Sequence, residues 1–253
     1  MRRGSKVEED AARKFRNASP TRSALHTLRG HRYAILLAAL LCVTLLKSFS
    51  QQLLHPVFAG LGMMATMLLV FLIVFDRRAD RRVALVALVI AAGAFVAPYM
   101  LPARHPQPFH IIDHSAALLL SGFATFVILR NIFAQRVIGA DDVLGAMCGY
   151  LLAAEAWSDL YLLIESCLPG SFRVSPGFGA GLDTWDGRIV VLSNVSLASL
   201  TSLGSSAAVA VHPPATILVP LESLFGQFYI AVVVAQLVGA RLTERQSGHS
   251  RND

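Results

Sequence analysis

Apolar residues in this chain gather in long runs that are separated by short polar or charged segments. Six runs are long enough to cross the ~30 Å hydrocarbon core of a membrane as α-helices, at ~1.5 Å per residue. They are Tyr33–Phe49, Val57–Phe75, Val83–Leu101, Ile111–Phe133, Val143–Leu168 and Ala215–Leu242. The pattern therefore predicts an all-α, polytopic membrane protein with about six transmembrane helices.

A shorter and more polar segment lies between the last two runs. Residues 189–203, "IVVLSNVSLASLTSL", mix apolar side chains with serine, threonine and asparagine. The segment is too polar for a full span and too apolar for an ordinary surface loop. Irregular backbone at membrane depth is tolerated only where protein or water covers it. We therefore expect a re-entrant helix and loop here.

Composition and charge agree with this pattern and add an orientation. The chain is 55% hydrophobic and 15% charged, with mean hydropathy +0.57, whereas soluble domains are about a quarter charged. Residues 1–32, "DRRADRR" (76–82), "RNIFAQR" (130–136) and the end of the chain from Arg241 onward together hold 18 of the 22 lysine and arginine residues. The positive-inside rule then puts both termini in the cytoplasm and the linker 169–188 outside.

The basic N-terminal segment 1–32 carries no signal-peptide cleavage pattern. Such a stretch binds anionic lipid headgroups or nucleic acid, or only sets orientation. We interpret it as a cytoplasmic tail that orients the chain, and we expect membrane lipids and no nucleic acid among the partners. A second, short cytoplasmic tail is expected at 243–253.

No motif of an enzyme stands out, so we expect neither catalytic activity nor a cofactor. The sequence has no nucleotide-binding glycine loop and no GxSxG elbow. The three cysteines, Cys42, Cys148 and Cys167, form no CxxC pair and no Cys/His metal pattern, so they indicate neither a disulfide framework nor a compartment.

Two C-terminal stretches carry a more specific pattern. Residues Leu221–Gly239 read "LESLFGQFYIAVVVAQLVG", and Asp141–Phe172 read "DDVLGAMCGYLLAAEAWSDLYLLIESCLPGSF". Between them stands "SLTSLGSSA", Ser199–Ala207, followed by a proline pair. The segment 141–242 resembles the bacterial potassium-channel-like family, whose corresponding patterns are "LEA..GQ.Y.AV.VARLVG", "D...GA...YLL...W...Y...E...PGSF" and "TLTTLGYGD".

The resemblance implies a pore unit of helix, pore loop and helix at 141–242, preceded by a four-helix transmembrane region at 33–135. It also implies a homotetramer in the inner membrane of a bacterium, because one pore loop cannot encircle an ion. The expected ligands are monovalent cations, with K⁺ as the family's ion. Passive flux of this kind needs no cofactor.

The filter itself departs from the family pattern. The residues equivalent to the filter are Thr201, Ser202, Leu203, Gly204, Ser205 and Ser206. Ser205 replaces a tyrosine that braces the family's filter, Ser206 replaces its second glycine, and Ala207 replaces its aspartate. A serine in a left-handed backbone position costs roughly 1 kcal/mol or more per subunit. We therefore expect weakened K⁺ selectivity.

Four residues of the last span belong to the resembling part of the chain. Glu222 is a buried carboxyl candidate that either acts in permeation or hydrogen-bonds the pore helix, and Gln227 follows it on the same helix. Gly226 and Gly239 allow close helix contact or a gating bend. Pro220, which the family pattern does not call for, predicts a kink or a restart of the helix.

Two further carboxylates, Glu155 and Asp159, lie four residues apart on one face of the fifth span. At membrane depth they need water, a partner or protonation. They either line an aqueous cavity and bind a cation, or they are paired inside the helix bundle. Lys47 in the first span is a candidate partner.

The stretch "HIIDH" places His110 and His114 four residues apart beside Asp113. That spacing suits a metal on one helix face, but no third ligand is evident. We interpret the stretch as an interfacial cap, because an aspartate suits a helix N-terminus.

Three alternatives to a channel stay open. A scaffold or regulatory relative would keep the fold without conducting. A transporter would use Glu155 and Asp159 to relay protons or to bind a cation. A membrane metalloenzyme would use His110 and His114.

Overall fold

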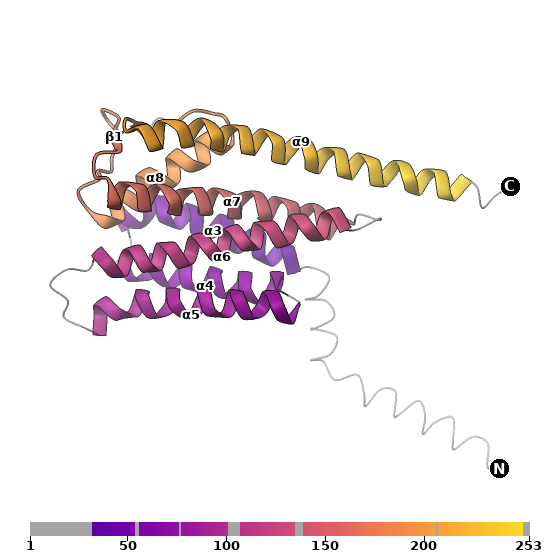
Figure 1. Cartoon of the computed structure of the whole chain (residues 1–253), viewed down its shortest axis with the longest axis horizontal. Helices are drawn as coiled ribbons and strands as arrows, with labels where there is room; N and C mark the ends of the chain where they lie inside the picture. The colour runs from indigo at the N-terminus through magenta and orange to yellow at the C-terminus, as the bar shows by residue number, and fades with distance from the viewer. Residues whose placement is uncertain are drawn as a thin grey trace, which may run out of the picture.

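The computed structural model describes residues 32–53, 56–75, 77–100, 107–134, 139–205 and 207–249. The N-terminal tail expected at 1–32 therefore lies outside the described residues, apart from its last residue. The described residues form seven α-helices and two short strands (Figure 1). In chain order these are α3 (Arg32–Leu53), α4 (Pro56–Val74), α5 (Arg78–Met100), α6 (Gln107–Ala134), α7 (Ala140–Cys167), β1 (Phe172–Val174), α8 (Trp185–Leu200), β2 (Ala208–Ala210) and α9 (Pro213–His249).

Each of the six apolar runs and the polar segment between the last two forms a helix. Within the described residues, three helices contain a segment that is long and apolar enough to cross a membrane. These helices are α6, α7 and α9. The described apolar part of α4, Leu61–Val74, is shorter than a span. The structure thus supports a mostly helical membrane protein, and the count of six spans stays a prediction.

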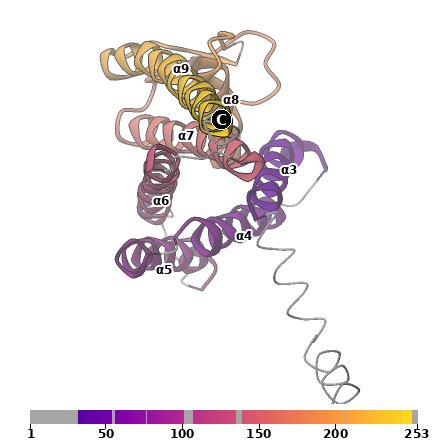
Figure 2. The same cartoon turned by 90° about the vertical axis from the view of Figure 1, so that its right-hand side faces the viewer.

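The helices α3 to α7 form a ring when the bundle is viewed end-on, and α9 lies on the far side of α7 (Figure 2). α7 packs against both α3 and α6, whereas α8 lies between α7 and α9. One apolar core fills the space among α3, α4, α6 and α7, and includes Leu36, Phe75, Ile128 and Leu152. α7 is therefore the helix that joins the first four helices to the C-terminal unit.

A second, smaller core lies at the end of the bundle where α7 ends. Tyr161 of α7, Phe172 of β1, and Val191 and Leu192 of α8 pack there with Ala215 of α9. β1 and β2 form an antiparallel pair on top of this core. This core fixes the position of α8 relative to the two long helices beside it.

Local sequence explains how α7 begins. α7 has two aspartates in its first turn, and the carboxylate of Asp142 accepts the N–H of Gly139 at 2.9 Å. Acidic side chains are favourable at this end of a helix because of its dipole. α9 runs on to His249, so the first residues of the tail expected at 243–253 continue the helix.

Candidate functional site

The N-terminus of α8 lies at the end of the bundle where α6 begins. Thr184 caps α8 by accepting the N–H of Gly187 at 3.1 Å. Gly187 must be a glycine, because a β-carbon there would overlap the carbonyl oxygen of Gly181. The ring of Trp185 stacks on His110 of α6, with ring centroids 4.2 Å apart.

The C-terminus of α8 is held between α7 and α9, partway along both. The hydroxyl of Tyr150 on α7 donates to the carbonyl of Leu200 at 2.8 Å. The hydroxyl of Ser223 on α9 donates to the carbonyl of Ser199 at 2.8 Å. Gly226 touches the same turn so closely that a β-carbon would overlap the carbonyl oxygen of Leu200. The predicted close helix contact at Gly226 is therefore present.

The residues directly after α8 close the helix in a Schellman turn. Ser202 has a positive φ of 57° and donates its N–H to Ser199 at 2.9 Å. Leu203 donates its N–H to Ala198, also at 2.9 Å. The hydroxyl of Thr201 donates back to the last turn of the helix at 2.7 Å. These residues thus form a helix cap, with their N–H groups folded back on α8.

The cap exposes side chains that face away from the bundle. Leu203 is 83% exposed, and Ser202 is also exposed. The side-chain amide of Gln227 on α9 donates to the hydroxyl of Ser202 at 2.9 Å. The structure therefore brings together Gln227 and the first filter-equivalent residues.

Two described residues of the filter-equivalent segment have a left-handed backbone, and both precede the position that the filter comparison predicts. That comparison expected the strain at Ser206, which lies outside the described residues. The positive φ angles are at Ser202 and at Gly204, whose φ is 78°. The hydroxyl of Ser205 accepts the N–H of Ala207 at 3.1 Å. A helix cap needs its left-handed residue directly after the helix, which explains the position of Ser202.

After the cap the chain returns to the end of the bundle from which α8 started. Ala207 accepts the N–H of Ser175 at 2.9 Å, and β2 pairs with β1 so that Ala210 lies opposite Phe172. Glu165 near the end of α7 fixes the same corner, since its carboxylate accepts the N–H of Phe172 at 3.1 Å. The segment between α7 and α9, which contains α8, therefore starts and finishes at the same end of the bundle (Figure 1).

Glu222 is fully buried and joins α9 to α7 and α8. Its Oε2 accepts the hydroxyl of Tyr161 at 2.6 Å, and its Oε1 lies 2.6 Å from the hydroxyl of Ser196. The Ser196 hydroxyl also lies 2.7 Å from the carbonyl of Ala154. Of the two roles expected for Glu222, these contacts match hydrogen bonding to α8.

Glu155 and Asp159 each contact a basic side chain of the first helices. Lys47 of α3 forms an ion pair with Glu155, and both side chains are largely buried. His114 of α6 lies with its Nδ1 2.6 Å from Oδ1 of Asp159, and both are 3% exposed. The Oδ2 of Asp159 is buried without a hydrogen-bond partner in the described part of the chain. The two carboxylates thus contact α3 and α6.

The "HIIDH" stretch is not the helix cap that the sequence predicted. α6 begins at Gln107, four residues before the apolar run predicted from Ile111, and it has no acidic residue in its first turn. Pro108 explains the earlier start, because proline is favoured in the first turn of a helix. His110 and His114 both contact Trp185 instead. Among the described residues, no three His, Cys, Asp or Glu side chains gather as a metal site.

Two other expectations for α9 turn out differently. The helix does not restart at Pro220, because α9 is continuous from Pro213 to His249. Gly239 lies away from the packed region, and a β-carbon there would meet no described atom within 4 Å. A role of Gly239 in close helix contact within one chain is therefore not supported.

Sequence reasoning missed three residues that hold this unit together: Tyr150, Tyr161 and Ser196. Each supplies a hydroxyl that bonds a neighbouring helix. Tyrosines inside an apolar run are the available signal, because a buried tyrosine hydroxyl usually finds a partner. The partner itself could not be read from the sequence.

Comparison with known proteins finds no matching family model, no matching curated protein and no matching solved structure.

Proposed function

We propose that the chain is one subunit of a homotetrameric channel for monovalent cations in the inner membrane of a bacterium, with both termini in the cytoplasm. The single observation that carries this proposal is the position of α8. It starts at one end of the bundle and ends between α7 and α9, beside Tyr150 and Gly226. At about 24 Å for 16 residues it is shorter than a membrane core.

The orientation of α8 favours a cation. The C-terminal end of a helix carries a partial negative charge, because its peptide dipoles are aligned. The last carbonyls of α8 accept hydrogen bonds from the cap, from Tyr150 and from Ser223, so this charge comes from the helix dipole and not from free carbonyl groups. In α8 that end lies beside Tyr150 of α7 and Ser223 of α9, and the proposal places these parts of both helices inside the membrane, where a cation gains most from the charge. In this proposal, α8 and the residues up to β2 take the role of the re-entrant pore helix and loop that the sequence predicts.

The exposed surface of α9 supports an oligomer. Ile217, Leu224 and Phe228 are each more than half exposed, and other large apolar side chains of the same helix are also uncovered. Exposed apolar patches of this extent mark contacts with lipid or with another protein. A ring of four α9 helices around a central axis would cover part of this surface and bring four copies of Leu203 toward that axis.

Flux through the purified protein in liposomes tests the proposal. Leu203→Cys should carry current that a positively charged thiol reagent blocks, whereas Asp183→Cys, exposed in the linker before α8, should react without block. Native mass spectrometry of the same preparation should give a tetramer. Absence of flux in a tetramer would overturn the channel, and a monomer would overturn the assembly.

Selectivity is a separate test of the same proposal. With serines in place of the tyrosine and second glycine, bi-ionic reversal potentials should show little preference for K⁺ over Na⁺. The triple variant Ser205→Tyr, Ser206→Gly and Ala207→Asp should raise that preference. A strong K⁺ preference in the unchanged chain would contradict the weakened filter.

Two observations favour alternatives. The Schellman turn at Ser202 and Leu203 ties the start of the loop to α8, which suits a scaffold or regulatory relative that does not conduct. The buried Oδ2 of Asp159 without a hydrogen-bond partner suits a transporter with a proton or cation site. Saturable, proton-coupled uptake that Glu155→Gln abolishes would favour the transporter.

A further inference from the structure

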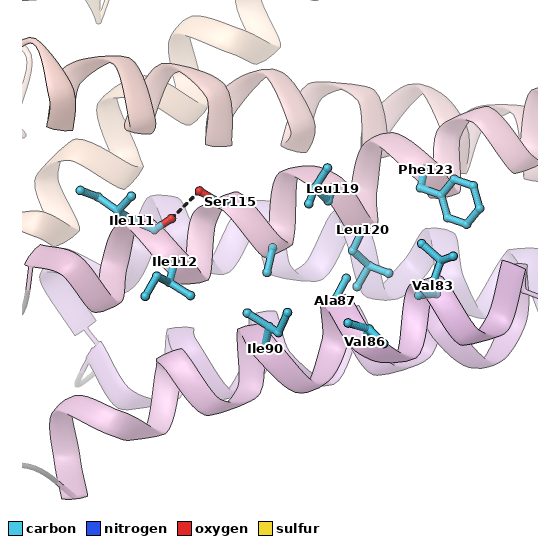
Figure 3. Close-up of a pocket in the computed structure, with 12 residues that line it drawn as sticks. Val83, Val86, Ala87, Ile90, Ile111, Ile112, Ser115, Leu119, Leu120 and Phe123 are labelled. Carbon is cyan, nitrogen blue, oxygen red and sulfur yellow. Dashed lines mark hydrogen bonds between the residues drawn. The ribbon is translucent and has the colours of Figure 1, made fainter.

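A groove of about 650 Å³ runs between α5 and α6 on the outside of the bundle (Figure 3). Its volume lies within the ~300–1,000 Å³ range of ligand-binding pockets. Its rim is formed by side chains that are well exposed, such as Val86 at 60% and Leu119 at 67%. Its floor is lined by the small, buried side chains of Ala84 and Ala87.

The groove offers hydrocarbon contacts and no free polar group. Ser115 is the polar residue among the 12 that line it, and its hydroxyl donates to the carbonyl of Ile111 at 2.7 Å. On α6 the groove reaches from Ile111 to Phe123, which is about 18 Å along a helix. This is a little more than half of the ~30 Å membrane core, so the groove matches a hydrocarbon chain that reaches in from one leaflet.

Arginines gather at the Val83 end of the groove. On α5, Arg78 and Arg82 are exposed and lie two turns and one turn before Val86, respectively, on the same helix face. On α6, Arg130 continues the face of Phe123, and its Nη2 bonds Oδ2 of Asp80 at 2.5 Å.

Arg130 is already paired with a carboxylate, and its side chain is 30% exposed. Asp80 therefore neutralises one of these three arginines, and the positive charges of Arg78 and Arg82 remain at this end. Their charge complements a phosphate group at the mouth of an apolar groove.

We propose that this groove binds one acyl chain of an anionic phospholipid, whose phosphate is held by Arg78 and Arg82. Basic residues at the cytoplasmic ends of membrane helices attract anionic headgroups, and the orientation inferred from charge puts these arginines in that leaflet. The inference depends on α5 and α6 lying in the membrane. It does not depend on conduction, so either claim can fail alone.

The test titrates the full chain, purified in a mild detergent, with phosphatidylglycerol or phosphatidylcholine of the same acyl chains. Native mass spectrometry counts bound lipids and gives their affinities. The unchanged chain should prefer phosphatidylglycerol by about fivefold or more, the size expected of one arginine. Arg78→Gln with Arg82→Gln should abolish this preference, whereas Arg173→Gln, in β1 at the other end of the bundle, should keep it.

A second pair of variants tests the groove itself. Ile90→Trp fills the groove from its rim and should weaken binding of both lipids at least fivefold. Val89→Trp places the same bulk on an exposed residue of α5 outside the groove and should leave binding unchanged. Equal affinity for the two lipids, an equal loss in Arg173→Gln, or unchanged binding in Ile90→Trp would each overturn the proposal.

Discussion

Gly226 lies where α9 touches the last turn of α8, with no space for a larger side chain. A methyl group there would overlap the carbonyl of Leu200, and overpacking of this kind costs about 1–3 kcal/mol. We expect Gly226→Ala to lower the thermal unfolding midpoint clearly. Gly239→Ala is the matched control in the same helix, and it should be neutral or slightly stabilising because alanine favours helix. Equal effects of the two changes would contradict the close contact.

Glu222 supplies the acceptors for two buried hydroxyl groups, Tyr161 and Ser196. Glu222→Ala leaves the Tyr161 hydroxyl without that partner, at about 1–3 kcal/mol, and it opens a cavity, whereas the Ser196 hydroxyl can still donate to Ala154. Glu222→Gln keeps an acceptor for Tyr161, and its amide can donate to Ser196 while Ser196 bonds Ala154. We therefore expect a loss of about 2–4 kcal/mol for alanine and of about 1 kcal/mol or less for glutamine, measured by denaturation in detergent. A loss for glutamine as large as that for alanine would show that the network needs a carboxylate.

For single residues, the sequence predicted which polar side chains are notable. It did not reliably predict which residues they contact. Glu155, Asp159 and Glu222 stood out because carboxyl groups are costly at membrane depth, and Lys47 was identified as a candidate partner. His114 was misassigned to a cap, because its partner Asp159 lies 45 residues away in the chain. The strained backbone at Ser202 also escaped prediction, since a helix cap depends on where α8 ends.

At the scale of elements, two buried polar pairs tie α7 to α3 and α6. Removing one partner of a buried ion pair costs about 3–5 kcal/mol, because it leaves an uncompensated charge. We expect Lys47→Met to destabilise the chain by this amount, and Lys47→Met with Glu155→Met to recover most of it.

The pair Arg32–Asp141 is the matched control, since it also joins α3 to α7 but is about one third exposed. Exposed pairs contribute about 0–1 kcal/mol, so Arg32→Met should have little effect. Unfolding free energies of the two single variants and the double variant give the coupling energy of Lys47 with Glu155. A double variant as unstable as Lys47→Met alone would contradict a compensated buried pair.

Helix positions were predictable because apolar runs and polar breaks mark them directly. Each expected helix is present, and most boundaries differ by only a few residues. The larger differences come from local chemistry that hydropathy does not report. Pro108 starts α6 early, and α5 begins with the charged turn from Arg78 to Arg82, outside its apolar run. Which helices touch could not be predicted, because α7 contacts α3 through residues more than 100 positions apart.

At the scale of the whole molecule, the distribution of charge and the exposed apolar surface point to one arrangement in a membrane. Arg77 and Arg82 lie at the end of the bundle where α5 begins, and Arg173 lies in β1 at the opposite end. Large apolar side chains such as Leu72, Val89 and Phe126 are exposed between these ends. Exposure of this kind is costly in water and is expected of helices that face lipid.

Labelling of single cysteines with a membrane-impermeant maleimide tests the orientation. The exposed residues Cys42 and Cys167 are first replaced by alanine, while Cys148 is buried and can stay. In intact bacterial cells Arg173→Cys should label, and Arg77→Cys should label only after permeabilisation, because arginine-rich loops stay in the cytoplasm. The reverse pattern would invert the orientation and move the proposed lipid site to the outer leaflet. Labelling of both in intact cells would contradict a bundle that spans the membrane.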